Sequence, residues 1–448
     1  MLRRCAISLL LTAMALPALA RTRPHYGGVL HVEITGDPWR GEDGLARSLA
    51  FDGLTTLDAN GMLQPALAAS WQSDGNDHRW DLRLRPGVHF HDGSPLTATA
   101  VVMSLNLACM GNCPWKAVRA AGTLSLIFTS DSPLPNLPAL LAGNAFLIAL
   151  TRNADGQTPA QPIGTGPFQV ASTAGNVLTL AANENCWQGR PFADQIVVTS
   201  HRSIHDQWLD LGVGRADVVE VPAEQLRQAQ QQRLTVVSSP PVRLLALAVS
   251  DSGTLANPML RAAIAQAVDR SATYNVIFQK QGEITASLLP QSLTGYAFLF
   301  PATRDLNKAN ELRGGLNPLP LMLKADGNGA IELTAQRLAL NLREAGFNVQ
   351  IAGNAQRADL VLMDLPIAGS DPTGVLASLL LNAGQPAAVS ARNPEALFRA
   401  EHDFLELHTI VPLLNLPRAY AVGGRLHNFA LHADGTPDLA SASVEEAP

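Results

Sequence analysis

Apolar and polar positions in the first third of the chain predict short strands joined by turns. Residues 28–34 have the apolar pattern of a strand. In residues 80–85, apolar side chains alternate with charged ones, which is the period of a half-buried strand. The dipeptides Pro86-Gly87 and Asp92-Gly93 follow as turns. From Thr97 the apolar spacing changes to three and four residues, which predicts a helix capped by the Thr97 hydroxyl.

The second half of the chain has a different pattern of apolar residues. Residues 244–249 form a continuous apolar run, and Asn257-Pro258 marks the start of a helix. Strands are predicted at residues 319–323 and 347–351, with a helix at 331–345 between them. A strand, a helix and a strand in this order predict a βαβ crossover, so this part of the chain is expected to be an α/β lobe.

The first twenty residues differ from the rest and predict export. Arg3 and Arg4 precede an apolar run from Ile7 to Leu19, and Ala18-Leu19-Ala20 has the small-x-small pattern of a signal peptidase site. The run is shorter than the roughly 18 apolar residues that indicate a membrane span. We therefore expect residues 1–20 to be a cleaved signal peptide and the mature chain to be periplasmic.

Length and charge limit the classes of function. With 448 residues, 47% hydrophobic and 16% charged, the chain is long enough for two or three domains and is too apolar to be disordered. The net charge of −6 provides no basic surface for a phosphate backbone, so nucleic acid is not expected as a partner.

Three cysteines follow the predicted signal peptide. Cys109 and Cys113 lie four positions apart at the end of the helical pattern, where Gly111 and Asn112 could bring the sulfurs together. An intact helix would hold them in unsuitable geometry, so both a disulfide and two unpaired thiols remain open. Cys186 is then left over. No other His or Cys pair completes a metal site, and we predict neither a metal nor a cofactor.

Two short motifs have a structural and a functional interpretation. Residues 164–168, Gly-Thr-Gly-Pro-Phe, resemble a phosphate-binding loop, but Pro167 lacks an N–H group and no lysine follows, which favours a tight turn. His89 and His91 could ligate a metal, yet alternate residues on a strand before an Asp-Gly turn give the same pattern. No G-x-S-x-G or H-E-x-x-H motif is present, so an enzyme is not predicted.

Many segments match one protein family in their order and spacing. They are Ala66–Trp71, Phe90–Gly93, Leu96–Ser104, Gly164–Phe168, Gly189–Pro191, Gly214–Val218, Asp269-Arg270, Asp371-Pro372 and Val411–Leu413. Together they resemble the extracellular solute-binding proteins of family 5, which are the oligopeptide, dipeptide and nickel receptors of ABC importers. The specificity comes from the ordered accumulation of weak motifs over nearly the whole mature chain.

The resemblance implies an α/β, two-lobed clamshell of class II, with mixed sheets and flanking helices. Residues 21–241 would form the first lobe with its β-rich subdomain, residues 242–408 an inserted α/β lobe, and residues 409–448 a return segment. It implies a monomer that captures a peptide or similar small solute and delivers it to permease subunits at the inner membrane. Two alternatives stay open: a receptor that senses or chaperones without an importer, and an exported hydrolase.

The resemblance also suggests where a ligand would be bound. Family peptide receptors commonly hold the ligand's α-amine with an acid four residues before the proline of an Asp-Pro element, and that place is Ala368 here. Asp364 or Asp371 could substitute for it. The candidate ligand contacts are Trp39, Trp115, Tyr420, Asp37, Arg40, Asp364 and Asp371. For the three aromatic residues, packing in the core or at the surface is the alternative interpretation.

Overall fold

The computed structural model describes most of the chain after the predicted signal peptide. The described residues are 26–40, 44–109, 113–152, 157–295, 301–315, 320–327, 329–352, 358–367, 369–385, 389, 391 and 393–445. Residues 1–20 and Ala368 lie outside them, so the predicted signal peptide and the replaced acidic position remain predictions.

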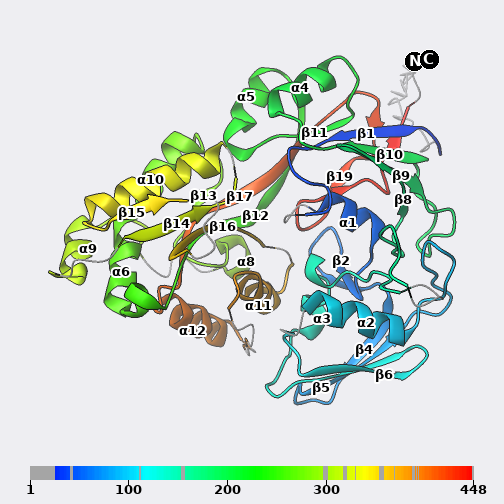
Figure 1. The fold of residues 1–448 in the computed structure, drawn as a ribbon, viewed down its shortest axis with the longest axis horizontal. Helices are drawn as coiled ribbons and strands as arrows, with labels where there is room; N and C mark the ends of the chain where they lie inside the picture. The colour runs from blue at the N-terminus through cyan, green and yellow to red at the C-terminus, as the bar shows by residue number, and fades with distance from the viewer. Residues whose placement is uncertain are drawn as a thin grey trace, which may run out of the picture.

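A mixed sheet of eleven strands runs through the molecule (Figure 1). In sheet order its strands are β15 (Val349–Ile351), β14 (Leu321–Ala325), β16 (Leu360–Pro366), β12 (Thr235–Val249), β17 (Ile410–Val422), β11 (Val218–Glu220), β1 (Val29–Glu33), β10 (Gln195–Thr199), β9 (Val177–Ala182) and β8 (Phe168–Ala174), with β13 (Glu283–Ile284) beside β17. The α/β part of the chain contributes one side of this sheet, and the N-terminal part contributes the other.

The long strands β12 and β17 connect the two sides. They pair antiparallel from Thr235 to Ala248, with register shifts on both sides of Pro241, which lies opposite Pro417. Because proline has no N–H group, neither of these two residues can donate to the ladder. Residue 242 lies inside β12 and residue 409 lies directly before β17, so both predicted lobe boundaries fall at this pair of strands. The division itself stays a prediction.

The first side of the sheet has a core built from both ends of the chain. Leu30 and Val32 of β1 pack with Phe168 of β8 and with Leu439 and Val444 near the C-terminus. The elements here include α1 (Leu45–Ala50), β18 (Leu426–His427), β19 (Ala430–Leu431), β20 (Pro437–Asp438) and β21 (Ser443–Val444). A second cluster packs α4 (Ile204–Gly212) and α5 (Leu226–Gln231) around β11 and β17, and η2 (Ala223–Gln225) directly precedes α5.

The short strands predicted for the N-terminal third lie in a β-rich subdomain, although residues 88–90 after the Pro86-Gly87 turn form only an isolated bridge from His89 to Pro95. Its four-stranded sheet has the order β4 (Ala68–Ser73), β5 (Arg79–Leu84), β7 (Ser125–Thr129) and β6 (Ala117–Gly122). Nearby lie β2 (Thr55–Leu57), β3 (Leu63–Pro65), α2 (Ala98–Cys109), α3 (Leu137–Leu140) and η1 (Asn144–Phe146). Leu82 and Leu84 of β5 are buried as their alternation predicts, and the Thr97 hydroxyl accepts a hydrogen bond from the Ala100 N–H at 3.2 Å.

The predicted βαβ crossover is confirmed in the α/β part. Strands β14 and β15 are parallel neighbours, and α10 (Ala330–Glu344) connects them. Gly346 follows α10 with a positive φ of 83°, as expected of a glycine beyond a helix C-terminus. The other elements here are η3 (Gly253–Ala256), α6 (Pro258–Ala267), α7 (Arg270–Ala272), the π-helix η4 (Thr273–Ile277), α8 (Gln291–Thr294), α9 (Leu306–Arg313), α11 (Pro372–Asn382) and α12 (Pro394–Leu405).

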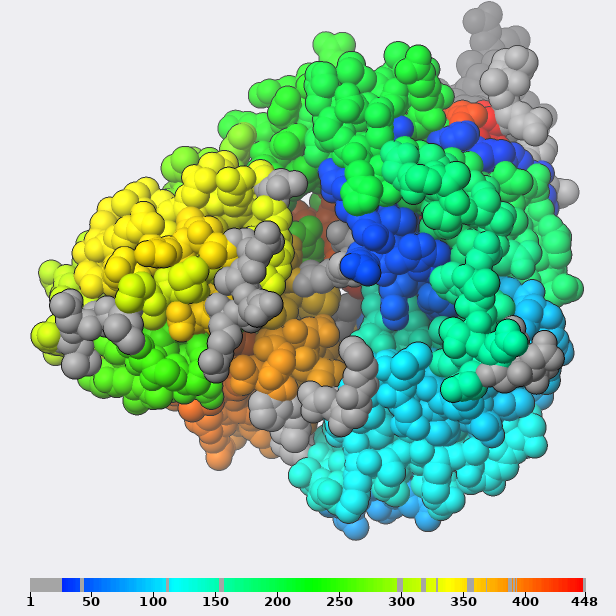
Figure 2. All heavy atoms as spheres, viewed as in Figure 1, coloured from blue at the N-terminus to red at the C-terminus, as the bar shows by residue number. Residues whose placement is uncertain are grey.

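The α/β part also contacts the β-rich subdomain directly. Helix α11 packs against α3, and Leu137 and Leu140 of α3 share one hydrophobic core with Val375 and Leu379 of α11 (Figure 1). In space-filling view the surface is indented between the yellow α/β part and the blue α1 region (Figure 2). The two halves of the molecule thus touch at the central strands and again at α3 and α11.

Candidate functional site

A cavity of about 1010 Å³ lies where these parts of the molecule meet. Its walls come from α1 and the residues before it, from β2, from α3 and η1, and from the C-terminal residues 432–441. Pro366 of β16, Arg418 of β17 and the end of α11 also contribute to the wall. Small-molecule sites have volumes of about 300–1,000 Å³, so this cavity can hold a solute of several residues.

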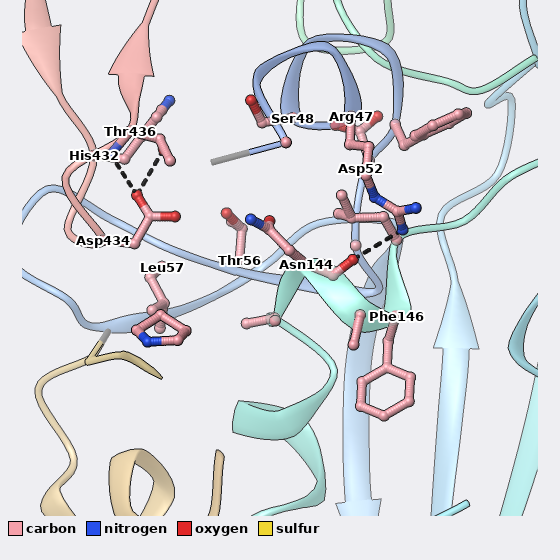
Figure 3. Close-up of a pocket in the computed structure, with 18 of the residues that line it drawn as sticks. Arg47, Ser48, Asp52, Thr56, Leu57, Asn144, Phe146, His432, Asp434 and Thr436 are labelled. Atoms are coloured by element: carbon pink, nitrogen blue, oxygen red, sulfur yellow. Dashed lines mark hydrogen bonds between the residues drawn. The ribbon is translucent and has the colours of Figure 1, made fainter. Parts of the chain in front are cut away.

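Arg47 of α1 forms a cationic part of the wall (Figure 3). Its Nη2 atom donates a hydrogen bond to the main-chain carbonyl of Asn144 at 3.1 Å, and its guanidinium carbon lies 6.0 Å from the Phe51 ring centroid. Burial lowers the pKa of Arg47 from its usual value. A guanidinium nevertheless stays charged at neutral pH, so the cavity has a permanent positive charge here.

Asp434 provides the opposite charge from the C-terminal segment (Figure 3). Its Oδ1 atom accepts hydrogen bonds from the N–H and the hydroxyl of Thr436, at 2.9 and 2.6 Å. Gly435 between them has a φ of +79°, and a Cβ there would lie 2.8 Å from Val242 Cγ2 and 3.0 Å from Arg418 Cβ. The loop therefore needs glycine at this position to lie close to the central strands.

Asp52 lines the cavity and is hydrogen-bonded to two residues from other segments. Its Oδ2 atom accepts hydrogen bonds from the Thr165 hydroxyl and from Trp187 Nε1, both at 2.8 Å. Burial, the largest effect, raises the pKa of Asp52, while the two hydrogen bonds oppose the shift. Asp52, which lies two positions after the end of α1, thus connects this segment to the loop that contains Thr165.

The loop of residues 164–168 is a tightly packed turn, as the structural interpretation predicts. A Cβ on Gly164 would lie 2.0 Å from the Ala50 carbonyl oxygen, and one on Gly166 would lie 2.6 Å from that of Leu49. His91 holds the loop from the other side: its Nδ1 accepts from the Gly164 N–H at 3.3 Å, and its Nε2 donates to the Gly166 carbonyl at 3.0 Å. These bonds use both ring nitrogens.

The residues before α1 include three of the predicted ligand contacts. Trp39 and Arg40 line the cavity. Asp37 is exposed, and its carboxylate accepts a hydrogen bond from the Trp39 N–H at 2.8 Å, which fixes the turn. The structure therefore brings Trp39 and Arg40 together at the cavity, with Asp37 shaping the segment that presents them.

The other two aromatic candidates lie in cores and do not line the cavity. Trp115 is 4% exposed and packs against Phe128 and Phe146, with ring centroids 5.2 and 5.1 Å away. Tyr420 is 8% exposed and packs against Phe429 in the core of the first side of the sheet. Their surroundings therefore agree with the alternative interpretation, in which these aromatic side chains pack in a core. Phe146 lines the cavity in place of Trp115.

The two acidic candidates also lie away from the cavity and have partners within the chain. Asp364 on β16 forms a bidentate ion pair with Arg243 on the neighbouring strand β12. Asp371 is the N-cap of α11, where its carboxylate accepts a hydrogen bond from the Gly374 N–H at 2.8 Å. Neither acid therefore lines this cavity, and a role of either one in holding a ligand stays a prediction.

Cys109 and Cys113 are joined in a disulfide, with Cα atoms 4.9 Å apart. This pair closes the end of α2, while Cys186 is buried as a free thiol. Among the described residues, no cluster of three or more His, Cys, Asp or Glu side chains could hold a metal ion. In the same part of the chain, no helix is both long and apolar enough to cross a membrane.

Sequence reasoning missed Arg47, Asn144, Thr56 and Asp434 as cavity residues. They share no motif, and only Arg47 and Thr56 lie near each other in the sequence. The one available signal was Arg47 itself, a single charged side chain within the otherwise mostly apolar stretch from Leu45 to Phe51.

The fold and the cavity define a two-lobed α/β binding protein, and comparison with known proteins gives its family. Residues 62–383 match the family described as bacterial extracellular solute-binding proteins, family 5 Middle. The chain belongs to this family, as the ordered motifs indicate.

Curated relatives include two solute-binding proteins. The nickel-binding protein NikA of Staphylococcus aureus is 23% identical over 317 residues, which are 67% of this chain and 64% of the relative. The glutathione-binding protein GsiB of Pectobacterium atrosepticum is 26% identical over 345 residues, 70% of this chain and 66% of the relative. The chain thus spans just under two thirds of the length of these relatives.

Solved structures have the same fold over almost the whole chain. The periplasmic binding protein AgaA of A. tumefaciens R10, in complex with agropinic acid, has a TM-score of 0.80 at 21% identity and covers 94% of this chain and 99% of its own. NikA of Staphylococcus aureus, in complex with Ni(L-His)2, has a TM-score of 0.77 at 18% identity and covers 93% and 100%. At these identities the likeness concerns the fold.

Proposed function

We propose that this protein is the periplasmic substrate-binding protein of an ABC importer. It captures a peptide or similar small solute between its lobes, releases it unchanged, and delivers it to permease subunits at the inner membrane. The observation that supports this most directly is the cavity of about 1010 Å³, whose walls come from both halves of a family 5 fold.

The position of the cavity suits a receptor that closes on its solute. Most of the wall comes from residues of the predicted first lobe, while Pro366 and the end of α11 lie in the predicted inserted lobe. A relative movement of the lobes therefore opens or closes the site. A solute that contacts both walls binds the closed arrangement more tightly, so occupancy shifts the population toward it. A membrane partner can then recognise the closed form.

Native mass spectrometry combined with small-angle scattering tests this proposal. The mature protein, purified from the periplasm of its own organism, is expected to carry a small solute whose mass can be measured. Removal of the solute by partial unfolding and dialysis should increase the radius of gyration, and its return should reverse the increase. Identical radii in both states, or a solute that is chemically changed on release, would contradict the proposal.

A further inference from the structure

We propose that the solute carries a carboxylate group and that Arg47 binds it. This inference rests on the proposed function and adds the chemical class of the ligand. It depends on the combination of two properties in one side chain: a charged group that lacks an acidic partner, and a position on the cavity wall.

Several other partly buried arginines have an acidic partner, which Arg47 lacks among the described residues. Arg243 pairs with Asp364, Arg425 with Asp217, and Arg304 with Glu344. The interior residues Arg261 and Arg270 donate to main-chain carbonyls, but neither lines the cavity. Arg47 forms no ion pair with any described residue, and its one hydrogen bond uses only part of its donor capacity.

The guanidinium of Arg47 is charged and partly buried, and the chain supplies little to replace the water it has lost. A cation that loses contact with water is destabilised unless an anion or several acceptors replace the water. Desolvation lowers the pKa of Arg47, and no carboxylate of a described residue forms an ion pair with it. A carboxylate on the solute would supply the missing partner, since its two oxygens match the fork of the guanidinium.

The rest of the wall favours a carboxylate over a phosphate. The side chains of Thr56 and Asn144 point into the cavity and offer neutral donors (Figure 3). Asp434 projects from the other wall, where it disfavours a second negative charge. Arg40 is exposed, and Arg418 packs against Gly435. The charges of the lining nearly balance, so a singly charged group suits the cavity better than a phosphate dianion; the charged lining residues are Arg40, Arg47, Arg418, Asp52, Asp434 and Asp438.

A paired panel of small molecules provides the test. Solute-free mature protein is screened by thermal shift against amino-acid derivatives, short peptides and small organic acids, each beside its primary amide, and against organic phosphates. Compounds that shift the melting temperature are then measured by calorimetry. We expect binding by acids, with the amide of each bound acid at least about tenfold weaker, because a hydrogen bond to a charged group is lost.

Three variants assign the effect to Arg47. Arg47→Gln should weaken binding of the acids at least about tenfold and leave their amides nearly unaffected. Arg47→Lys keeps the charge and should retain part of the affinity, which shows that the site is still folded. Arg119→Gln makes the same change of charge at an exposed strand position outside the cavity and should bind like the wild type.

The outcomes separate this inference from the proposed function. Equal binding of acids and amides, stronger binding of phosphates, or undiminished binding by Arg47→Gln would overturn the role of Arg47 while leaving a receptor that closes on its solute. If no compound binds and no solute co-purifies with the protein, both proposals fail.

Discussion

The backbone N–H of Ser370 donates a hydrogen bond of 2.8 Å to the carbonyl oxygen of Gly61, although 309 positions separate the two residues. The Ser370 hydroxyl donates to the same oxygen at 2.9 Å. Gly61 lies in the turn between β2 and β3, and Ser370 directly precedes the N-cap of α11. The bond thus links the β-rich subdomain to the α/β part of the chain.

The Gly61 turn has no room for a side chain in this arrangement. A Cβ on Gly61 would lie 2.9 Å from both the Gly369 carbonyl carbon and the Ser370 nitrogen. We predict that Gly61→Ala keeps the lobes apart, with weaker solute binding and a larger radius of gyration in the solute-bound state. Scattering and calorimetry measure both quantities.

Gly75→Ala is the matched control for Gly61→Ala. Gly75 also has a positive φ, +86°, but a Cβ there meets no atom within 4 Å. Both substitutions should cost about 1–2 kcal/mol of folding free energy from the left-handed backbone alone. Equal solute affinity of the two variants would contradict a role of the Gly61 contact in closure.

Trp115→Ala should act on stability. Because Trp115 is almost fully buried against Phe128 and Phe146, its removal leaves a large hole in the core of the β-rich subdomain. We expect a loss of about 3–5 kcal/mol in the free energy of unfolding of that unit. Denaturant titration measures it.

Trp39→Ala gives the contrasting case. Trp39 lines the cavity and is only half-buried, so we expect weaker solute binding with a smaller loss of stability than for Trp115→Ala. Calorimetry on the folded variants compares the two. Full stability of Trp115→Ala would contradict the core position of Trp115, and normal solute binding by Trp39→Ala would contradict a ligand contact by Trp39.

His91 should make stability depend on pH in a defined window. Burial lowers its pKa below the ordinary value of 6.5, so the folded chain binds this proton less readily than the unfolded chain does. Its stabilising contribution is complete above pH 6.5 and is lost as the pH falls from there through the folded pKa. Denaturation at a series of pH values should show this decline.

The His91→Gln variant isolates that contribution. Glutamine can offer one acceptor and one donor to the Gly164–Gly166 loop but does not titrate. The difference in unfolding free energy between wild type and variant should therefore change between neutral pH and pH 5. A constant difference would show that His91 does not titrate differently in the two states.

Asp52→Ala should lower the free energy of unfolding, because it removes two hydrogen bonds next to the cavity. It leaves the Thr165 hydroxyl and Trp187 Nε1 without their acceptor, which we expect to cost about 1–3 kcal/mol in unfolding free energy. Asp52→Asn keeps an acceptor oxygen and removes the buried charge, so it should be much less destabilising. Denaturant titration of both variants decides whether the hydrogen bonds are the main contribution.

Local periodicity was sufficient to predict much of the fold. The alternation before Arg85, the capped helix after Thr97 and the crossover through α10 depend on neighbouring residues, so the sequence contains their signal. The ordered family motifs supplied the arrangement of lobes, which no local pattern contains.

The cavity could be predicted only in part because its residues become neighbours through folding. Arg47 and Asp434 lie on walls that are far apart in the chain, and neither is in a motif. By position, Asp364 and Asp371 were plausible ligand contacts. In the structure Asp364 forms an ion pair with Arg243, and Asp371 caps α11. Partnerships of this kind depend on distant strands and loops, so one sequence does not reveal them.

Pro241 and Pro417, which face each other in the ribbon of β12 and β17, have a consequence for how fast the protein can work. These two residues can exchange no ladder bond, so we expect bending of the ribbon at this point to break few hydrogen bonds and the closing movement to meet a low barrier. We expect the rate of solute capture to be governed by diffusion to the cavity mouth, with the rate of escape determined by the contacts that form after the swing.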